Sequence, residues 1–387
     1  MSSNKHETYF PEVDYLRAYA ILLVLFRHTH YSFPFFITDY PIFLQGTWSG
    51  VDLFFVISGF VITLSLVPSS QALHAGRLSL KNYLSSFFVR RFFRLLPIAF
   101  TSIALYMILG YGYNSSGQFG KFQELKQEVL PILLYFHNYY IWTGGSTNMS
   151  WYWSLSIEEQ FYLIYPFILA FIPRRKVQMI LFGFFIVLIT FILRPFTTPS
   201  FESVDFKLWP FFTTPSHLRF DALFAGCLSA LVHLKYRFTF YDWISKHIAL
   251  GRLLVAVCLF GIVTFGAILP HFQLTSYPAI ILCSSFLILI AASSKRLIPT
   301  FGFQNVFNWI GKRSYSLYLF HIIAIRSINE FWFRSYGLEE TQLSNLQGVI
   351  GYVSALLLTI LLVEFLFVFV ETKSIQIGRK LSNRILN

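Results

Sequence analysis

The sequence predicts an all-α integral membrane protein, and three observations lead to that prediction. First, 55% of the 387 residues are apolar and only 12% are charged, which is about half the charged fraction of a soluble domain. Second, the apolar residues occur in runs of about 20, the length that a helix needs to cross a bilayer. Third, the 30 Lys and Arg residues cluster between those runs, as in cytoplasmic loops. The net charge of +12 therefore indicates membrane topology rather than nucleic-acid binding.

About ten runs are long enough to span the membrane, and they predict a single membrane-embedded domain over residues 1–387 with both termini in the cytoplasm. The expected spans lie near 15–36, 48–67, 95–113, 151–172, 177–196, 211–234, 249–270, 273–293, 303–327 and 347–370. The run 127–143 is shorter and is interrupted by polar residues. Counting it as a span would place the basic cluster at 174–176 outside, so we expect a re-entrant or interfacial segment there.

Two further features bound the class of protein. Residues 1–11 are polar and of mixed charge, which predicts that the first span is retained rather than cleaved as a signal. Cys227, Cys258 and Cys283 all lie within apolar runs, as small core residues do. We therefore expect neither a disulfide framework nor a metal site from these cysteines.

The first span carries one arginine and one histidine, Arg17 and His28, shortly after Asp14. Eleven helical steps amount to three turns plus about 20°, so Arg17 and His28 share one face, about 16 Å apart along the axis. Polar groups are costly in hydrocarbon. We therefore expect both side chains to point into a helical bundle.

The second span contains Asp52 near its outer end and the pair Ser58-Gly59 further along. Ser58 and Gly59 either allow close helix packing or a bend, or they belong to a functional site; the residues alone leave both interpretations open. Asp52 is a candidate functional carboxylate, or a partner that orients a functional residue.

A basic segment leads into the third span. Arg91 and Arg94 are three residues apart in this segment, so they are neighbours on one helical face. The planar guanidinium group suits the binding of phosphates. The alternative is an anchor at the membrane surface that only follows the positive-inside rule.

Three later spans also carry ionisable residues. The fourth contains the adjacent carboxylates Glu158 and Glu159, which are rare inside a span without a role. The sixth contains Arg219 and Asp221, which can neutralise each other. The ninth contains His321, which is either a hydrogen-bonded core histidine or part of a site.

Depth in the membrane relates these candidates to one another. Counted from the outer ends of their spans, His28, Glu158, Asp221 and His321 all lie about 9 to 15 Å deep. The three arginines that can bind phosphate (Arg17, Arg91, Arg94) lie at the inner face. The sequence therefore predicts a cavity with an anion-binding mouth inside and a proton-handling centre further out.

These residues resemble the motifs of the membrane acyltransferase 3 family, whose members include O-acetyltransferases of surface polysaccharides. The matching stretches are Arg17-x10-His28 preceded by Asp14, Gly50 to Phe60, Arg91-x2-Arg94, Trp153 to Tyr162, and Ser314 to His321. They follow the family's order and cover essentially the whole chain. The family usually ends on Glu-x-Pro, whereas this chain has Glu371-Thr-Lys373. No hydrolase-like domain follows the last span, so we expect the single-domain form.

The resemblance implies an enzyme of the bacterial inner (cytoplasmic) membrane that uses acetyl-CoA as acyl donor and no metal. The acceptor would be a hydroxyl of a surface glycan or lipid-linked sugar, such as lipopolysaccharide O-antigen or another surface polysaccharide. We expect Arg17, Arg91 and Arg94 to hold the CoA phosphates. The candidates for substrate-binding or supporting roles are Asp14, Ser58, Glu159, Arg219, Asp221 and His321.

For the chemical step we expect direct transfer, with His28 as general base. Glu158 or Asp52 would orient His28 and stabilise its charged form. An acyl-histidine intermediate is the alternative.

Two other functions stay open. A proton-coupled small-molecule transporter would also use intramembrane histidines and carboxylates, although we find no internal repeat of the kind that transporters show. An acyltransferase acting on a small secondary metabolite would need the same donor site. Acyl-dependent incorporation would separate the enzyme from the transporter.

Overall fold

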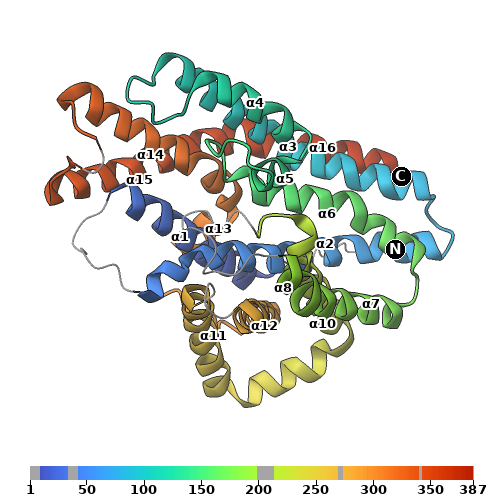
Figure 1. The fold of residues 1–387 in the computed structure, drawn as a ribbon. Helices are drawn as coiled ribbons and strands as arrows, with labels where there is room; N and C mark the ends of the chain where they lie inside the picture. The colour runs from blue at the N-terminus through green and yellow to red at the C-terminus, as the bar shows by residue number, and fades with distance from the viewer. Residues whose placement is uncertain are drawn as a thin grey trace.

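The computed structural model describes residues 9–33, 42–197, 213–268, 273–293, 295–339 and 342–386, and every regular element within them is helical (Figure 1). This confirms the all-α class. The helices that enclose the site are α1 (Pro11–Ser32), α2 (Gly50–His74), α3 (Leu80–Gly112), α6 (Tyr152–Phe171) and α14 (Ser314–Tyr336). The other α-helices are α4 (Phe122–Leu133), α5 (His137–Trp142), α7 (Arg175–Val187), α8 (Arg194–Thr197), α10 (Phe220–Lys246), α11 (Ile248–Ile268), α12 (Gln273–Ala292), α13 (Gln304–Lys312), α15 (Asn345–Leu366) and α16 (Thr372–Leu386). Short 3-10 or π-helical segments are η1 (Ile42–Ser49), η2 (Leu188–Leu193), η4 (Ser216–Leu218) and η6 (Phe367–Glu371).

Within the described residues, six helical stretches are long and apolar enough to cross a membrane. They are Gln45–His74, Leu80–Gly112, Arg175–Thr197, Ile248–Ile268, Thr275–Ala292 and Asn345–Leu386. By helix length and composition, the chain is a multi-pass membrane protein. The other expected spans, near 15–36, 151–172, 211–234 and 303–327, are also helical but do not combine that length and apolarity. The expected span ends near 36, 211 and 270 lie outside the described residues, and the count of ten stays a prediction.

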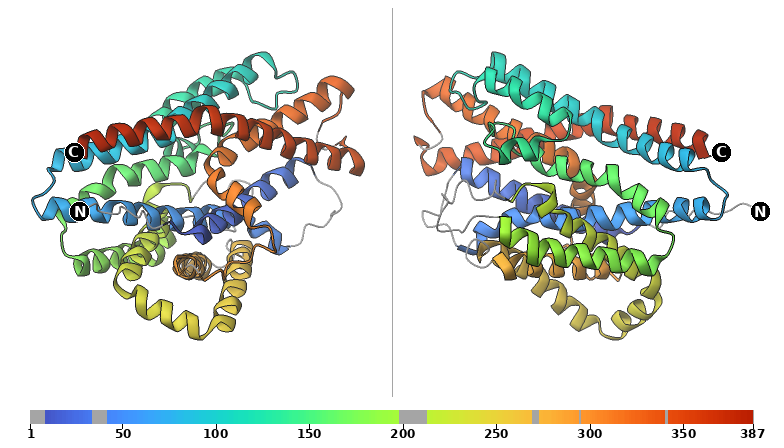
Figure 2. Two further views of the ribbon diagram at one scale, coloured as in Figure 1. Left: turned by 180° about the vertical axis from the view of Figure 1, so that it is seen from behind. Right: turned by 45° about the vertical axis from the view of Figure 1, so that its right-hand side comes forward.

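Helix α3 begins well before residue 95, where the third span was expected to begin, so the basic segment before that span is helical. Helix α3 begins at Leu80, where the Ser79 hydroxyl caps it by accepting a hydrogen bond from the Asn82 N–H at 3.2 Å. The charged first half of α3 packs along α16, and the two helices lie side by side in both views of Figure 2. Because tertiary packing stabilises a helix more than propensity does, this basic segment continues as a helix. Arg91 and Arg94 therefore project from α3 itself.

The expected ninth span, near 303–327, is two helices. Helix α13 ends at Lys312, and α14 begins at Ser314. Gly311 lies where α13 crosses α1 so closely that a Cβ atom there would be 2.0 Å from the backbone oxygen of Asp14. The chain turns after this crossing, and α14 then packs against α1 as well. This second contact brings the C-terminal part of α1 beside His321.

The segment 127–143 forms no spanning helix. Helix α4 ends at Leu133, and the left-handed residue Tyr135 (φ 56°) separates it from the short α5. Helix α4 has 12 residues, which gives about 18 Å and is too short for the hydrocarbon core. The buried Glu128 accepts hydrogen bonds from His137 Nε2 at 3.2 Å and from the Met149 N–H at 2.8 Å. The segment is thus fixed beside the start of α6, and its depth in the membrane stays a prediction.

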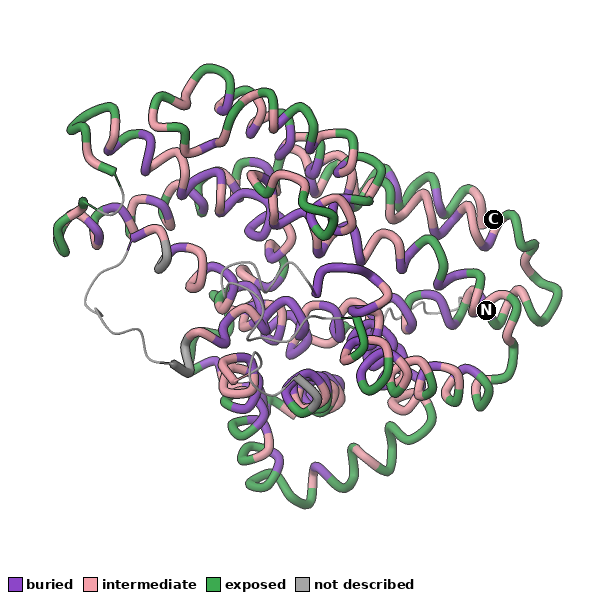
Figure 3. Tube along the Cα trace, viewed as in Figure 1, coloured by how far each residue is buried: buried purple, intermediate pink, exposed green. Residues whose placement is uncertain are grey.

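The core centres on the contact between α2 and α10, where buried residues are concentrated (Figure 3). A Cβ atom at Gly59 would lie 2.0 Å from the Leu223 carbonyl oxygen, and one at Gly226 would lie 2.0 Å from the Val56 oxygen. Two glycines therefore let the backbones of α2 and α10 touch. The packing interpretation is confirmed for Gly59, which leaves Ser58 on a different face.

Candidate active site

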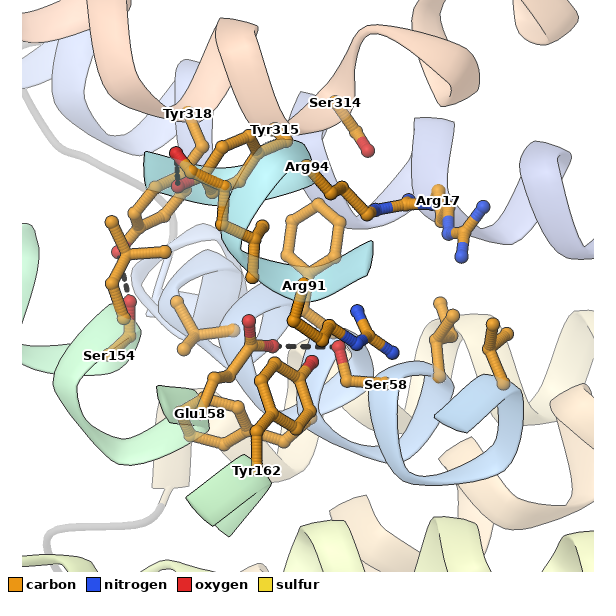
Figure 4. Close-up of a pocket in the computed structure, with 17 residues that line it drawn as sticks. Arg17, Ser58, Arg91, Arg94, Ser154, Glu158, Tyr162, Ser314, Tyr315 and Tyr318 are labelled. Carbon is orange, nitrogen blue, oxygen red and sulfur yellow. Dashed lines mark hydrogen bonds between the residues drawn. The ribbon is translucent and has the colours of Figure 1, made fainter. Parts of the chain in front are cut away.

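A pocket of about 750 Å³, including its open mouth, lies between α1, α2, α3, α6 and α14 (Figure 4). Its polar lining consists of Arg17, Ser58, Arg91, Arg94, Ser154, Glu158, Tyr162, Ser314, Tyr315 and Tyr318. Apolar side chains, chiefly from α2, complete the wall. Five of the sequence candidates (Arg17, Ser58, Arg91, Arg94 and Glu158) therefore meet in one place.

The three arginines form the basic side of this pocket. Arg17 Nη1 binds Asp14 Oδ1 at 2.8 Å, and the Tyr9 hydroxyl donates to the other oxygen of Asp14 at 2.9 Å. Asp14 thus orients Arg17 from outside the pocket. The Arg91 guanidinium lies 4.4 Å from the Tyr162 ring centroid, a cation–π contact.

Arg91 and Arg94 form no ion pair with any residue that the structure describes, although Arg17 and Arg91 are charged neighbours of Arg94. Three neighbouring guanidinium groups with one fixed carboxylate partner create a positive field in the pocket. Such a field favours a ligand with several negative charges.

Glu158 lies opposite the arginines and not beside His28. The Ser58 hydroxyl donates to Glu158 Oε1 at 2.7 Å, and Figure 4 shows this carboxylate directed into the pocket beside Tyr162. The sequence analysis placed Glu158 with the histidines because their depths in the membrane were all counted from the outer ends of the expected spans. The pocket instead extends over several turns, and α3 begins early enough to bring Arg91 to the same level.

The adjacent Glu159 faces elsewhere, because successive helical residues project about 100° apart. It lines a second pocket of about 330 Å³ with Tyr135, Tyr152 and apolar side chains of α3 and α4. Leu155 and Tyr315 line both pockets and form the wall between them.

His28 and His321 come together from α1 and α14, as their similar predicted depths suggested. His321 Nε2 lies 3.1 Å from His28 Nδ1, and the ring centroids are 4.9 Å apart. Neither histidine lines the large pocket. The Tyr318 ring, which does line it, lies 5.9 Å from the His321 ring. Neither Glu158 nor Asp52 contacts His28, so the orienting contact expected from a carboxylate is made by His321.

The remaining charged candidates form two buried ion pairs that differ from the expected one. Arg219 Nη2 binds Asp52 Oδ1 at 2.9 Å, and Arg194 Nη2 binds Asp221 Oδ2 at 2.6 Å. Mutual neutralisation of Arg219 and Asp221 is therefore wrong. Each instead has its ion-pair partner on another helix, Asp52 on α2 and Arg194 on α8, and both guanidinium groups lie over the ring of Tyr277.

Sequence reasoning missed several residues of this region. Arg194 was not singled out, because it was counted with the basic residues on the outer side of the membrane, although an arginine at the end of an apolar run signals a buried partner. Tyr162 and Tyr318 were quoted within motifs but not singled out. Their spacing gives the signal: Tyr162 follows Glu158 by one helical turn, and Tyr318 precedes His321 by one. Within the described ranges, no group of three or more His, Cys, Asp or Glu side chains could hold a metal ion.

Chemically, the arrangement combines an anion-binding pocket with a pair of histidines, and the side chain of Tyr318 lies between the two. The guanidinium groups suit phosphates, and a partly exposed histidine suits proton transfer from a hydroxyl. His28 is partly exposed, whereas His321 is fully buried. Of the two, His28 is therefore the one that a substrate can reach.

Comparison with known proteins identifies the family. The family model described as "Acyltransferase domain" matches residues 10–364. The O-acetyltransferase OatA of Staphylococcus aureus is 27% identical over 393 residues, which covers 94% of this chain and 57% of the relative. The peptidoglycan O-acetyltransferase OatA of Listeria monocytogenes is 29% identical over 390 residues, covering 94% of this chain and 55% of the relative.

The chain spans little more than half the length of these two curated relatives. No solved structure matches it. The family match nevertheless includes every stretch that lines the large pocket, from Arg17 to Tyr318, and both histidines. The resemblance drawn from the motifs is confirmed, and the protein belongs to the membrane acyltransferase 3 family.

Proposed function

We propose that this protein is an O-acetyltransferase of the bacterial cytoplasmic membrane, which moves an acetyl group from cytoplasmic acetyl-CoA to a hydroxyl of a cell-surface polysaccharide. The observation that carries the proposal is the convergence of Arg17, Arg91 and Arg94 on one pocket that Tyr318 also lines, while the Tyr318 ring packs beside His321 of the histidine pair. In the topology expected from the positive-inside rule, the two termini and the side of the pocket that carries the arginines face the cytoplasm.

The donor binds with its phosphates at the three arginines, through charge-assisted hydrogen bonds. Arg17 is held in place by Asp14, while Arg91 and Arg94 make no ion pair among the described residues and are available to the ligand. Glu158, anchored by Ser58, offsets part of the positive charge and leaves room for the donor. The acyl-bearing arm then extends along α1, whose rise from Arg17 to His28 is about 16 Å.

In the chemical step, His28 takes the proton of the acceptor hydroxyl. The hydroxyl oxygen attacks the thioester carbonyl carbon, the carbon–sulfur bond breaks, and CoA leaves as the thiolate. A positioned general base contributes about 10²–10⁴-fold. The transfer is direct, and the polysaccharide ester and CoA are the two products.

For the acceptor we favour a peptidoglycan hydroxyl, because the Listeria monocytogenes relative is named a peptidoglycan O-acetyltransferase. Lipopolysaccharide O-antigen and lipid-linked sugars present the same hydroxyl chemistry and are separate outcomes of the test. All of these acceptors meet the enzyme on the side of the membrane opposite to CoA.

The test measures ester-linked acetyl groups on purified envelope glycans by mass spectrometry. Four strains are compared: wild type, a deletion, and the deletion complemented with His28→Ala or His247→Ala. His247 is exposed at the end of α10 and provides the matched control. We expect loss of acetyl ester on deletion, rescue by His247→Ala and no rescue by His28→Ala.

A second assay gives membrane vesicles isotopically labelled acetyl-CoA and follows the label into glycan. Glycan esters that persist at wild-type level in the deletion would contradict the polysaccharide acceptor. Proton-dependent solute export that needs the protein but no acyl-CoA would contradict the enzyme and support the transporter.

A further inference from the structure

The histidine pair has a hydrogen-bonding pattern that fixes where its protons lie. His321 Nδ1 lies 2.7 Å from the Tyr318 carbonyl oxygen, and His28 Nδ1 lies 3.0 Å from the Val24 carbonyl oxygen. A carbonyl oxygen can only accept a hydrogen bond. Both Nδ1 atoms therefore carry the proton when the rings are neutral, because a lone pair in either place would face another lone pair.

The contact between the two rings follows from this assignment. A neutral imidazole protonated at Nδ1 has an unprotonated Nε2. His321 Nε2 therefore offers a lone pair to the Nδ1–H of His28 across 3.1 Å. The hydrogen bonds run in one direction, from His28 to His321 and from His321 to the Tyr318 carbonyl. At the start of this chain, His28 Nε2 is unprotonated and forms no hydrogen bond with any described residue.

We infer that His321 is the positioning residue of the reaction: together with the Val24 carbonyl oxygen it accepts the Nδ1–H of His28, which orients the ring and leaves Nε2 ready to accept a proton. The inference rests on the proposed function for the identity of the substrate proton. When Nε2 of His28 takes that proton, its Nδ1 proton moves onto, or is shared with, His321 Nε2. The charge is then spread over two rings, and the proton count is unchanged.

The choice of a second histidine has a physical reason. A buried carboxylate in this place would hold a negative charge in the bilayer interior throughout the cycle, and an unpaired buried charge is costly. His321 is fully buried, and burial of this kind disfavours the charged form of an imidazole. It therefore stabilises the charged form of His28 without introducing a permanent charge, and it never needs to touch the substrate.

The test uses two substitutions of His321 in the full-length protein. In His321→Gln, the amide oxygen can take the place of Nε2 as acceptor for the His28 N–H. In His321→Leu the side chain offers no acceptor. We expect His321→Leu to lower kcat about 100-fold, the scale of a positioned base, with the KM for acetyl-CoA unchanged. His321→Gln should recover most of the rate and shift the acidic limb of the pH–rate profile.

The matched control is His233→Leu, because His233 is a partly buried helical histidine that packs edge-on against Phe10 and Phe60 and lines neither pocket. It should keep wild-type kinetics. Unchanged CoA affinity and thermal midpoint in all three variants would show that they fold. If His321→Gln and His321→Leu fold normally but lose kcat equally, the role of His321 is steric and the inference is overturned.

Nitrogen NMR of ¹⁵N-histidine-labelled protein in detergent separates this inference from the proposed function. The resonances of His28 are assigned by their loss in His28→Ala. We expect a protonated Nδ1 and an unprotonated Nε2 in the wild type, and in His321→Leu the same tautomer with a shifted Nδ1 resonance, because only the Val24 carbonyl oxygen then accepts that proton. Protonated Nε2 in the wild type would overturn the inference even if transfer is observed. The expected tautomer with no acetyl transfer would contradict the proposed function alone.

Discussion

Arg219 Nη2 lies 2.9 Å from Asp52 Oδ1, and the two side chains are only 1% and 2% exposed. This pair ties the start of α10 to the start of α2, the two helices that form the centre of the core. Four aromatic rings surround the Arg219 guanidinium: those of Trp48, Phe55, Trp153 and Tyr277. The pair is therefore shielded from water on all sides that the structure describes.

Removing one partner should destabilise the protein more than removing both. Asp52→Ala leaves a buried, uncompensated guanidinium, for which the cost is about 3–5 kcal/mol. The double variant Asp52→Leu with Arg219→Leu should recover most of that loss. Thermal unfolding in detergent measures both. The control is Asp242→Ala, because the Asp242–Lys246 pair is 65% and 68% exposed and should contribute little to stability.

A methyl group at Gly59 should separate α2 from α10. The added Cβ would lie 2.0 Å from the Leu223 oxygen, and such overpacking typically costs about 1–3 kcal/mol. Gly183→Ala in α7 is the control, because no atom lies within 4 Å of the added Cβ. It should raise stability by roughly 0.5–1 kcal/mol, since alanine favours the helix. Equal effects of the two substitutions on the unfolding midpoint would contradict the close backbone contact.

Arg94→Ala should weaken the binding of CoA. A hydrogen bond to a charged group contributes about 1.5–3 kcal/mol, so the dissociation constant should rise by about tenfold or more. Isothermal titration with CoA measures it, at two salt concentrations. Arg77→Ala, which removes an exposed arginine before α3, should leave the affinity unchanged. If the two variants bind CoA equally, the arginine pocket is not the donor site.

Acid should weaken the contact that Glu330 makes with Ser115 and Ser116. Glu330 lies in the last part of α14, after the end of the expected span at 327. Burial raises the pKa of Glu330, but hydrogen bonds from Arg334, Ser116 and the Ser115 N–H outweigh it, so the net pKa is lowered. A carboxylate with a lowered pKa stabilises the folded state above its unfolded pKa of about 4.3, and this contribution is lost as pH falls through the folded value.

Measured relative to the intrinsic exchange rate at each pH, hydrogen exchange at the Ser115 and Ser116 amides should therefore accelerate at acidic pH in the wild type. Glu330→Gln removes the titrating group, and the acid-dependent part of the acceleration should disappear. Acceleration of the same size in Glu330→Gln would assign the effect to another group.

The sequence predicts the elements of this fold better than their partners. Apolar runs locate the long helices, and the eleven-residue spacing correctly places Arg17 and His28 on one continuous helix. The start of α3 was missed because the charged residues were taken as a sign of a loop. Packing against α16 keeps this charged segment helical. The partners of Arg219 and Asp221 could not be predicted, because each lies on an element distant in the chain.

The same limit applies to the site. Five candidates chosen from the motifs line the large pocket, and Arg91 and Arg94 are neighbours on one helical face, as their spacing predicts. Motif spacing does not show that Glu158 meets Ser58 or that His28 meets His321, because both contacts depend on how separate helices cross. The roles of these residues stay predictions until the variants are measured.

The continuity of α1 has a consequence for precision. The interval between Arg17 and His28 lies within a single helix, so backbone hydrogen bonds and covalent geometry set it, not the fit between two elements. Side chains on separate helices change their separation when the bundle expands or tilts with bilayer thickness, whereas two positions on one helix do not. Under the proposed function, the distance between the anchored end of the donor and the base therefore stays the same in membranes of different composition.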